Sequence, residues 1–154
     1  WFYDVSEQGY RHHMSDIFAS IGLSQLKRLD QFKKKRYDLV CYYVKLLRQE
    51  SVKLIANIDH EETMAHIFPI ILEEGVDRIK LKEKLFKRGI ETGFHYFPNH
   101  KLTFYRDNKA KELKITEKIY HRLITLPLHY DLSLNDIEYI VNCLKIDINL
   151  LKGK

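Results

Sequence analysis

The chain has 154 residues, of which 45% are hydrophobic and 31% charged, and it carries a formal net charge of +5. This is an ordinary globular composition with enough residues for a core, and it argues against intrinsic disorder. No apolar run approaches the roughly 18 residues of a membrane span, so we expect no membrane partner. The start, Trp-Phe-Tyr-Asp-Val, lacks the basic and apolar regions of a signal peptide and an initiator methionine. We therefore expect the chain to begin inside a longer protein.

The two cysteines, Cys41 and Cys143, lie far apart within helical apolar patterns, which predicts two buried thiols and no disulfide framework. Such thiols fit a reducing cytoplasm, where we expect the protein to reside. A positive net charge can indicate a nucleic-acid partner. The basic residues are instead spread over several predicted helices, so we rank nucleic-acid binding last and expect no such partner.

Residues 1–50 are predicted to form an interface loop followed by linker helices. Ser15 is the expected N-cap of a helix over 16–29. Apolar residues cover most faces of this helix, which predicts burial at an interface or at the base of a larger domain. A second helix over 30–49 repeats apolar residues at helical spacing. Asp30 is a weak boundary, so one long bent helix is the alternative.

Residues 51–154 are predicted to form a small C-terminal α+β domain. The predicted elements are strands over 52–55, 65–72 and 90–96, a helix from Asp77 to Arg88 ended by Gly89, a polar stretch over 105–113, a helix over 116–123, an extended segment over 125–129, a helix capped by Ser133 with Asp136, and a tail over 147–154. Pro69 places the second strand at a sheet edge or turns its missing N–H outward. Segregated strands and helices predict a small, mostly antiparallel sheet flanked by helices.

The sequence contains no glycine-rich phosphate loop. His12 and His13 would face opposite ways on a strand, and His95 with His100 supplies only two ligands, so we expect no metal site. Two segments, residues 9–17 and 89–100, instead gather glycines, aromatic rings and basic groups at the ends of predicted elements. Loops at such places are where binding residues concentrate.

These segments resemble the DegT/DnrJ family of sugar-nucleotide aminotransferases, which are pyridoxal-phosphate enzymes of fold type I. The Gly-Tyr motif of that family appears as Gly-Tyr-Arg-His-His-Met-Ser-Asp-Ile from Gly9, followed by the helix motif over 19–26. The motif Gly-Ile-x-Thr-Gly-x-His-Tyr-x-Pro-x-His appears over 89–100, with Tyr105 after it. The third motif appears as Thr116-Glu117, Arg122 and Leu126-Pro127-Leu128-His129. The three motifs keep the family order and spacing over nearly the whole chain.

The resemblance assigns roles to several residues. In family dimers the Gly-Tyr loop of one subunit reaches the cofactor phosphate of the other, which implies cofactor-binding roles for Arg11 and His13. An arginine can bind phosphate through two hydrogen bonds. The residues that the resemblance implies for substrate binding are Tyr96, His100 and His95, of which His95 also suits an anchor at the strand end. Loop packing is the alternative for each, and we interpret Arg122 and His129 as structural.

The family chemistry needs a lysine that forms a Schiff base with the cofactor aldehyde. The resemblance places it upstream, and we find no matching stretch here, so we expect this chain to hold no catalytic residue and to be inactive alone. The full-length protein is expected to aminate a nucleotide-linked keto-sugar with pyridoxal phosphate shared across a dimer. Its partners would be a second subunit or the missing large domain. A non-catalytic association module or remnant, and part of a sugar dehydratase, are the alternatives.

Overall fold

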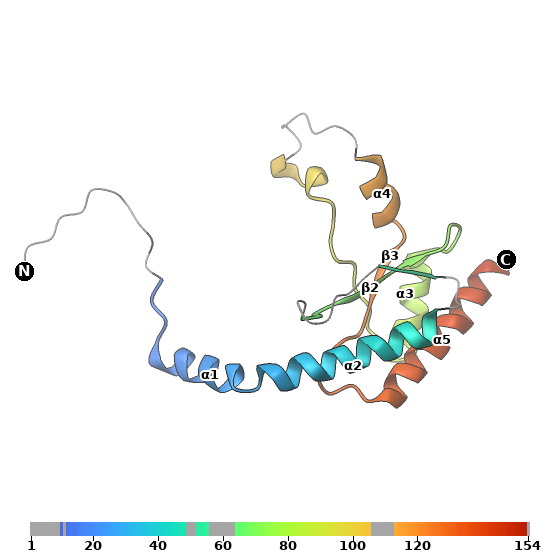
Figure 1. Ribbon diagram of the computed structural model, residues 1–154. Helices are drawn as coiled ribbons and strands as arrows, with labels where there is room; N and C mark the ends of the chain where they lie inside the picture. Colours follow the sequence, from blue (N-terminus) through green and yellow to red (C-terminus); the bar gives the residue numbers. More distant parts are fainter. Residues whose placement is uncertain (1–9, 11, 49–51, 56–63, 106–112, 154) are drawn as a thin grey trace, which may run out of the picture.

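The computed structural model describes residues 10, 12–48, 52–55, 64–105 and 113–153. The described helices are α1 Asp16–Leu26, α2 Leu29–Leu47, α3 Arg78–Lys87, α4 Lys114–Tyr120 and α5 Leu134–Lys152; the strands are β1 Val52–Leu54, β2 Phe68–Leu72 and β3 Leu123–Leu126; two 3-10 turns are η1 Asn99–Lys101 and η2 Thr103–Tyr105. This arrangement confirms the α+β prediction, with two N-terminal helices leading into a small sheet flanked by helices (Figure 1).

The three strands form one antiparallel sheet in the order β1-β2-β3. Pro69 therefore lies in the central strand, and its predicted edge position is wrong. The N–H groups along a strand alternate between the two neighbours, and that of Leu72 points to β3, where it donates to the Arg122 carbonyl. Pro69 thus turns its missing N–H towards β1, beyond Leu54, the last residue of that strand. The alternative of an outward-turned proline is correct.

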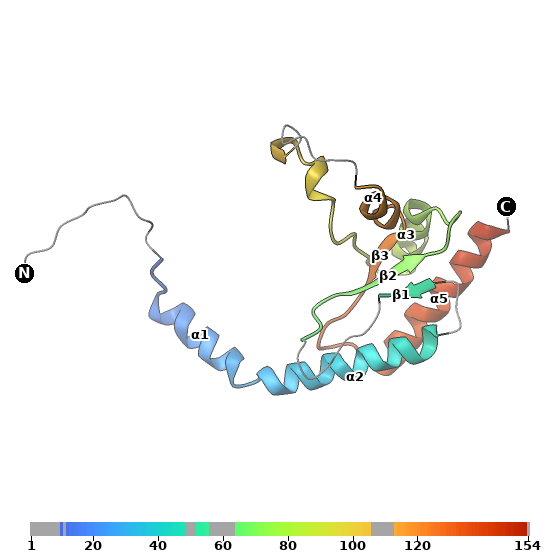
Figure 2. The same cartoon turned by 45° about the horizontal axis from the view of Figure 1, so that its top comes forward.

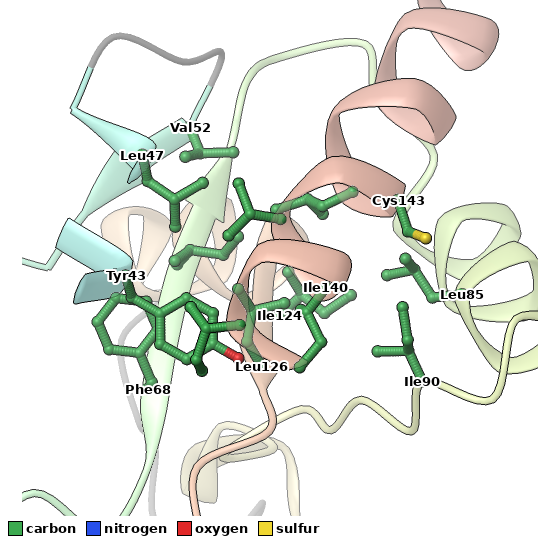
Figure 3. Packing of buried hydrophobic residues seen from close by; sticks show 14 of the residues in the cluster. Tyr43, Leu47, Val52, Phe68, Leu85, Ile90, Ile124, Leu126, Ile140 and Cys143 are labelled. Atoms are coloured by element: carbon green, nitrogen blue, oxygen red, sulfur yellow. The ribbon is translucent and has the colours of Figure 1, made fainter. Parts of the chain in front are cut away.

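One hydrophobic core lies between the sheet and helices α2, α3 and α5 (Figure 3). Alternate side chains of β2 are buried and face this core. The ring of Tyr43 in α2 stacks on Phe68 in β2 with 4.6 Å between centroids, and its hydroxyl donates to the Pro127 carbonyl at 2.9 Å. Burial raises the pKa of Tyr43 far above its ordinary value, so the hydroxyl stays protonated and remains a donor.

A partly buried ion pair connects the end of α3 to α5. Arg88 donates to both carboxylate oxygens of Asp147, from Nε at 3.0 Å and from Nη2 at 3.1 Å, and Asp147 is 1% exposed. The two parallel hydrogen bonds compensate the carboxylate for its lost hydration. Because Asp147 and Ile148 are buried here, α5 continues to Lys152. The prediction that residues 147–154 form a tail is therefore wrong through Lys152.

The predicted helix caps are confirmed. The hydroxyl of Ser15 accepts from the Phe18 N–H, the carboxylate of Asp77 accepts from two N–H groups of the first turn of α3, and Ser133 with Asp136 forms a capping box. Gly89 has φ +78° and ends α3, with its N–H donating to the Phe86 carbonyl. This left-handed residue turns the chain from α3 into the segment that begins at Ile90.

Three local predictions differ from the structure in whole or in part. Instead of a strand over 90–96, the structure has a single bridge between Gly93 and Thr125. The helix predicted from Thr116 begins at Lys114 and has no side-chain cap. Cys41 is exposed, since it lies on the outer face of α2, whereas Cys143 is buried as predicted; both are free thiols.

Helix α1 projects away from the rest of the chain, and a break at Lys27 and Arg28 separates it from α2 (Figures 1 and 2). None of its side chains is buried, and Ile17 and Phe18 are 72% and 68% exposed. The described residues therefore do not bury this helix as predicted. Among these residues, no helix combines the length and apolar character needed to cross a membrane.

We predict that Tyr43→Phe lowers the free energy of unfolding by about 1 kcal/mol, because the Pro127 carbonyl loses its donor while the ring stack remains. Urea denaturation followed by circular dichroism measures this change. Tyr42→Phe is the matched control, since the Tyr42 hydroxyl contacts the surface residue Glu138. Equal effects of the two substitutions would contradict the assigned importance of the Tyr43 hydroxyl.

Candidate functional site

A cavity of about 740 Å³ lies beside β3. Its walls come from the segment 89–93 with His95, from the chain that follows β3, from His66 and Ile67, and from the first turns of α5. The site therefore joins parts of the second and third sequence motifs. His129, interpreted above as structural, lines this cavity together with His95.

The backbone of Gly93 fixes one wall of the cavity. Its N–H donates to the Thr125 carbonyl at 3.1 Å, and its carbonyl accepts from the Thr125 N–H at 2.8 Å. The His95 ring folds back over Gly93 so closely that a Cβ there would stand 2.5 Å from Cε1 of the ring. Glycine is required at this position because the ring occupies the space of a side chain.

Three buried polar atoms gather around this pair: Oγ1 of Thr92, Nδ1 of His95 and Oγ1 of Thr125. None has a hydrogen-bond partner within the part of the chain that the structure describes. Buried polar groups without partners are costly, so these atoms favour a polar ligand or ordered water in the cavity. The sequence did not indicate either threonine as a site residue, although Thr92 belongs to the second motif.

Tyr96 and His100 lie outside this cavity, on the loop that follows it. The Tyr96 side chain is exposed, and its ring meets the His95 ring edge-on at 4.9 Å between centroids. The peptide bond between these two residues is cis. The His100 side chain is 12% exposed and its Nε2 lies 3.0 Å from Oε1 of Glu117. The structure thus brings His95 and Tyr96 together and places His100 against α4.

Glu117 of α4 is also a site residue. The sequence places it in the third motif but does not indicate which residues it contacts. It pairs with Lys101 at 2.5 Å as well as with His100. Hydrogen bonds from Lys101 and from His100 hold the pKa of Glu117 below its ordinary value. The carboxylate therefore links the loop to α4.

The residues expected at the cofactor lie at the other end of the chain. Arg11 is outside the described residues, and His13 is exposed on the segment before α1. Arg122, interpreted as structural, donates from Nε to the Leu72 carbonyl at 2.7 Å and pairs with Glu74, both contacts within the body of the domain.

The described residues do not form a pyridoxal phosphate site by themselves. An aminotransferase holds that group with a lysine at its aldehyde and a cradle for its phosphate, and no lysine lines the cavity within the described ranges. Those ranges also contain no cluster of three potential metal ligands.

Comparison with known proteins identifies the family of this chain. The sequence profile of the DegT/DnrJ/EryC1/StrS aminotransferase family matches residues 2–145. The chain belongs to this family. The match spans all three motifs, so the resemblance identified from the sequence is confirmed.

Two curated relatives illustrate the likeness. An uncharacterised protein of Methanocaldococcus jannaschii is 30% identical over 94% of this chain and 39% of its own length. The UDP-4-amino-4,6-dideoxy-N-acetyl-beta-L-altrosamine transaminase of Campylobacter jejuni, serotype O:23/36, is 28% identical over 94% of this chain and 39% of its own length. The chain thus spans about two fifths of the length of the curated relatives it matches.

Solved structures show the same fold. A candidate sugar aminotransferase of Streptococcus pneumoniae, in its PMP form, superposes with a TM-score of 0.86 at 29% identity and covers 98% of this chain and 39% of that one. Helicobacter pylori PseC, an aminotransferase involved in the biosynthesis of pseudoaminic acid, superposes with a TM-score of 0.83 at 26% identity over 96% of this chain and 41% of that one. The S. pneumoniae protein has also been solved in a PLP form.

We predict that Glu117→Gln reduces stability at neutral pH and has little effect in acid. A carboxylate with a lowered pKa contributes stability above its ordinary pKa of 4.5, and that contribution is lost as the pH falls through the lowered value. Melting temperatures of both proteins between pH 7 and pH 3 measure the difference, which should shrink as the pH falls. Glu83→Gln, on the exposed face of α3, is the control. A difference that is constant with pH would contradict the assignment.

Proposed function

We propose that this chain is the C-terminal part of a pyridoxal-phosphate-dependent aminotransferase that converts a nucleotide-linked keto-sugar to an amino sugar in the cytoplasm. The carrying observation is the family match over residues 2–145, which spans all three motifs, of which the second and third contribute to the cavity and its adjoining loop. The name of the C. jejuni relative, a transaminase of a UDP-linked amino sugar, supports the substrate class.

In this proposal the chain binds and orients the substrate. Tyr96 exposes its ring and hydroxyl from the loop, and His100 is held by Glu117 so that its ring has a fixed place. Tyr96 contacts His95, which lines the cavity, and the unpartnered polar atoms there can bind hydroxyl groups of a sugar. Sugars are bound through many such hydrogen bonds, which suits a polar wall of this kind.

We assign Arg11 and His13 to the cofactor phosphate of a neighbouring subunit. His13 is exposed and lies on the projecting N-terminal segment, away from the cavity of its own chain (Figure 1). A residue in this position can reach a second subunit more readily than its own cavity. Cationic side chains provide hydrogen bonds and charge for a phosphate.

The lysine that forms the Schiff base belongs, in this proposal, to the large domain. We predict that borohydride reduction with pyridoxal phosphate, followed by peptide mass spectrometry, gives one stoichiometric lysine adduct in the full-length protein and none within this chain. The chain alone should give no specific adduct. A stoichiometric adduct at a lysine of this chain would contradict its proposed inactivity.

The same measurement separates the alternatives. A full-length protein that binds the cofactor without any lysine adduct would favour the sugar dehydratase, in which a histidine replaces the lysine. A protein that does not bind the cofactor would favour the association module. The exposed apolar residues of α1 are the observation that supports the association-module hypothesis.

We further propose that α1 is covered by a second subunit or by the large domain, because an apolar helix without a cover is a typical interface element. We predict that the isolated chain self-associates in sedimentation velocity and that Phe18→Lys weakens the association at least tenfold. Ser24→Lys, on the same exposed helix, tests the effect of charge alone. A wild-type chain that sediments as a monomer at high concentration would refute the proposed interface.

A further inference from the structure

The loop that carries Tyr96 and His100 is an excursion from the sheet. It leaves at Gly93 and returns through α4 to β3, on the side away from α2 (Figures 1 and 2). Helix α4 has seven residues, no buried side chain and no side-chain N-cap. So short a helix is not stable by itself in water. The position of the loop therefore depends on contacts between α4 and the body of the domain.

Arg78, the first residue of α3, lies between the two legs of this excursion. Its guanidinium carbon is 4.1 Å from the ring centroid of Phe94 on the outgoing leg and 4.2 Å from that of Tyr120 on the returning leg. Although Arg78 is charged, only 9% of its surface is exposed. The burial of a cation between two rings indicates a fixed structural element rather than a solvated surface charge.

The same guanidinium also holds the backbone. It donates to the carbonyl of Tyr120 and, at 3.3 Å, to that of Leu123, where α4 passes into β3. A planar guanidinium can stack on two rings while its edge donates to carbonyl groups. A lysine ammonium lacks this planar fork. Lys82, one turn further along α3, places its ammonium over the Phe94 ring at 4.9 Å from the centroid.

From α4 the contacts continue to the loop. The Tyr120 ring meets Phe97 edge-on at 5.5 Å between centroids, and Glu117, one turn earlier, binds His100 and Lys101. A continuous set of contacts thus runs from Arg78 through Tyr120 and α4 to both ends of the segment 97–101. A change at Arg78 is expected to reach His100 along this route.

We propose that Arg78 is a positioning residue for the nucleotide-sugar substrate. It fixes α4 against Phe94 and thereby sets the place of the loop that carries Tyr96 and His100. This inference rests on the proposed function, in which that loop contacts the substrate. Arg78 does not touch the substrate, so its replacement weakens substrate binding and leaves the rate of the bound complex largely intact.

The kinetic test uses the full-length protein with UDP-4-amino-4,6-dideoxy-N-acetyl-beta-L-altrosamine as amino donor and 2-oxoglutarate as acceptor. Arg78→Lys should raise the KM for the nucleotide sugar roughly tenfold and change kcat less than about twofold. Tyr120→Phe keeps the ring and should retain the wild-type KM, whereas Tyr120→Leu should reproduce the increase. Arg122→Lys is the matched control, since its guanidinium also binds a carbonyl but faces β2. An unchanged KM in Arg78→Lys would overturn the proposal.

Hydrogen exchange measured by mass spectrometry provides a readout that does not depend on the substrate. In full-length Arg78→Lys, amides of residues 94–105 and 114–122 should exchange roughly tenfold faster, while those of α5 keep their wild-type rates. Faster exchange throughout the domain, or no change in the loop, would overturn the positioning role. A wild-type protein inactive with this sugar would exclude it as the substrate, whereas the exchange result would still decide whether Arg78 holds the loop.

Discussion

The two backbone hydrogen bonds between Gly93 and Thr125 are the constraint on which the candidate site depends. They fix the chain after α3 to the free edge of β3, and this single attachment divides it into two parts with different tasks. Before Gly93 the chain forms a wall of the cavity, with Thr92 beside it; after Gly93 it leaves the sheet as the loop with Tyr96 and His100. Because the His95 ring covers Gly93, this glycine also determines how the cavity wall joins the loop.

Features determined by a few neighbouring residues could be predicted from the sequence. The caps at Ser15, Asp77 and Ser133 are predictable because each needs only a side-chain oxygen within reach of the next turn. The apolar pattern of residues 90–96 suits a strand, but only Gly93 has a partner, because the chain then turns away from β3. The end of α5 could not be read locally either, since Asp147 is helical and buried through an arginine 59 residues earlier.

Only part of the candidate site could be predicted, because several of its contacts join residues from separate segments of the chain. The motifs contained His95, Tyr96, His100 and Glu117, and family resemblance gave the first three a role. The contact between His100 and Glu117 joins residues of two motifs, and no spacing rule indicates it. Arg78 was assigned only to a helix, because the two rings that enclose it come from separate segments and meet only in the folded chain.

Pro69 has a consequence for how the sheet can change during evolution. Since its nitrogen has no hydrogen and faces the side where β1 has ended, no further rung can be added to the β1–β2 ladder at that point. A shift of β1 by one residue towards Pro69 would leave a carbonyl without a donor and reverse the faces of the strand. The proline therefore acts as a register stop.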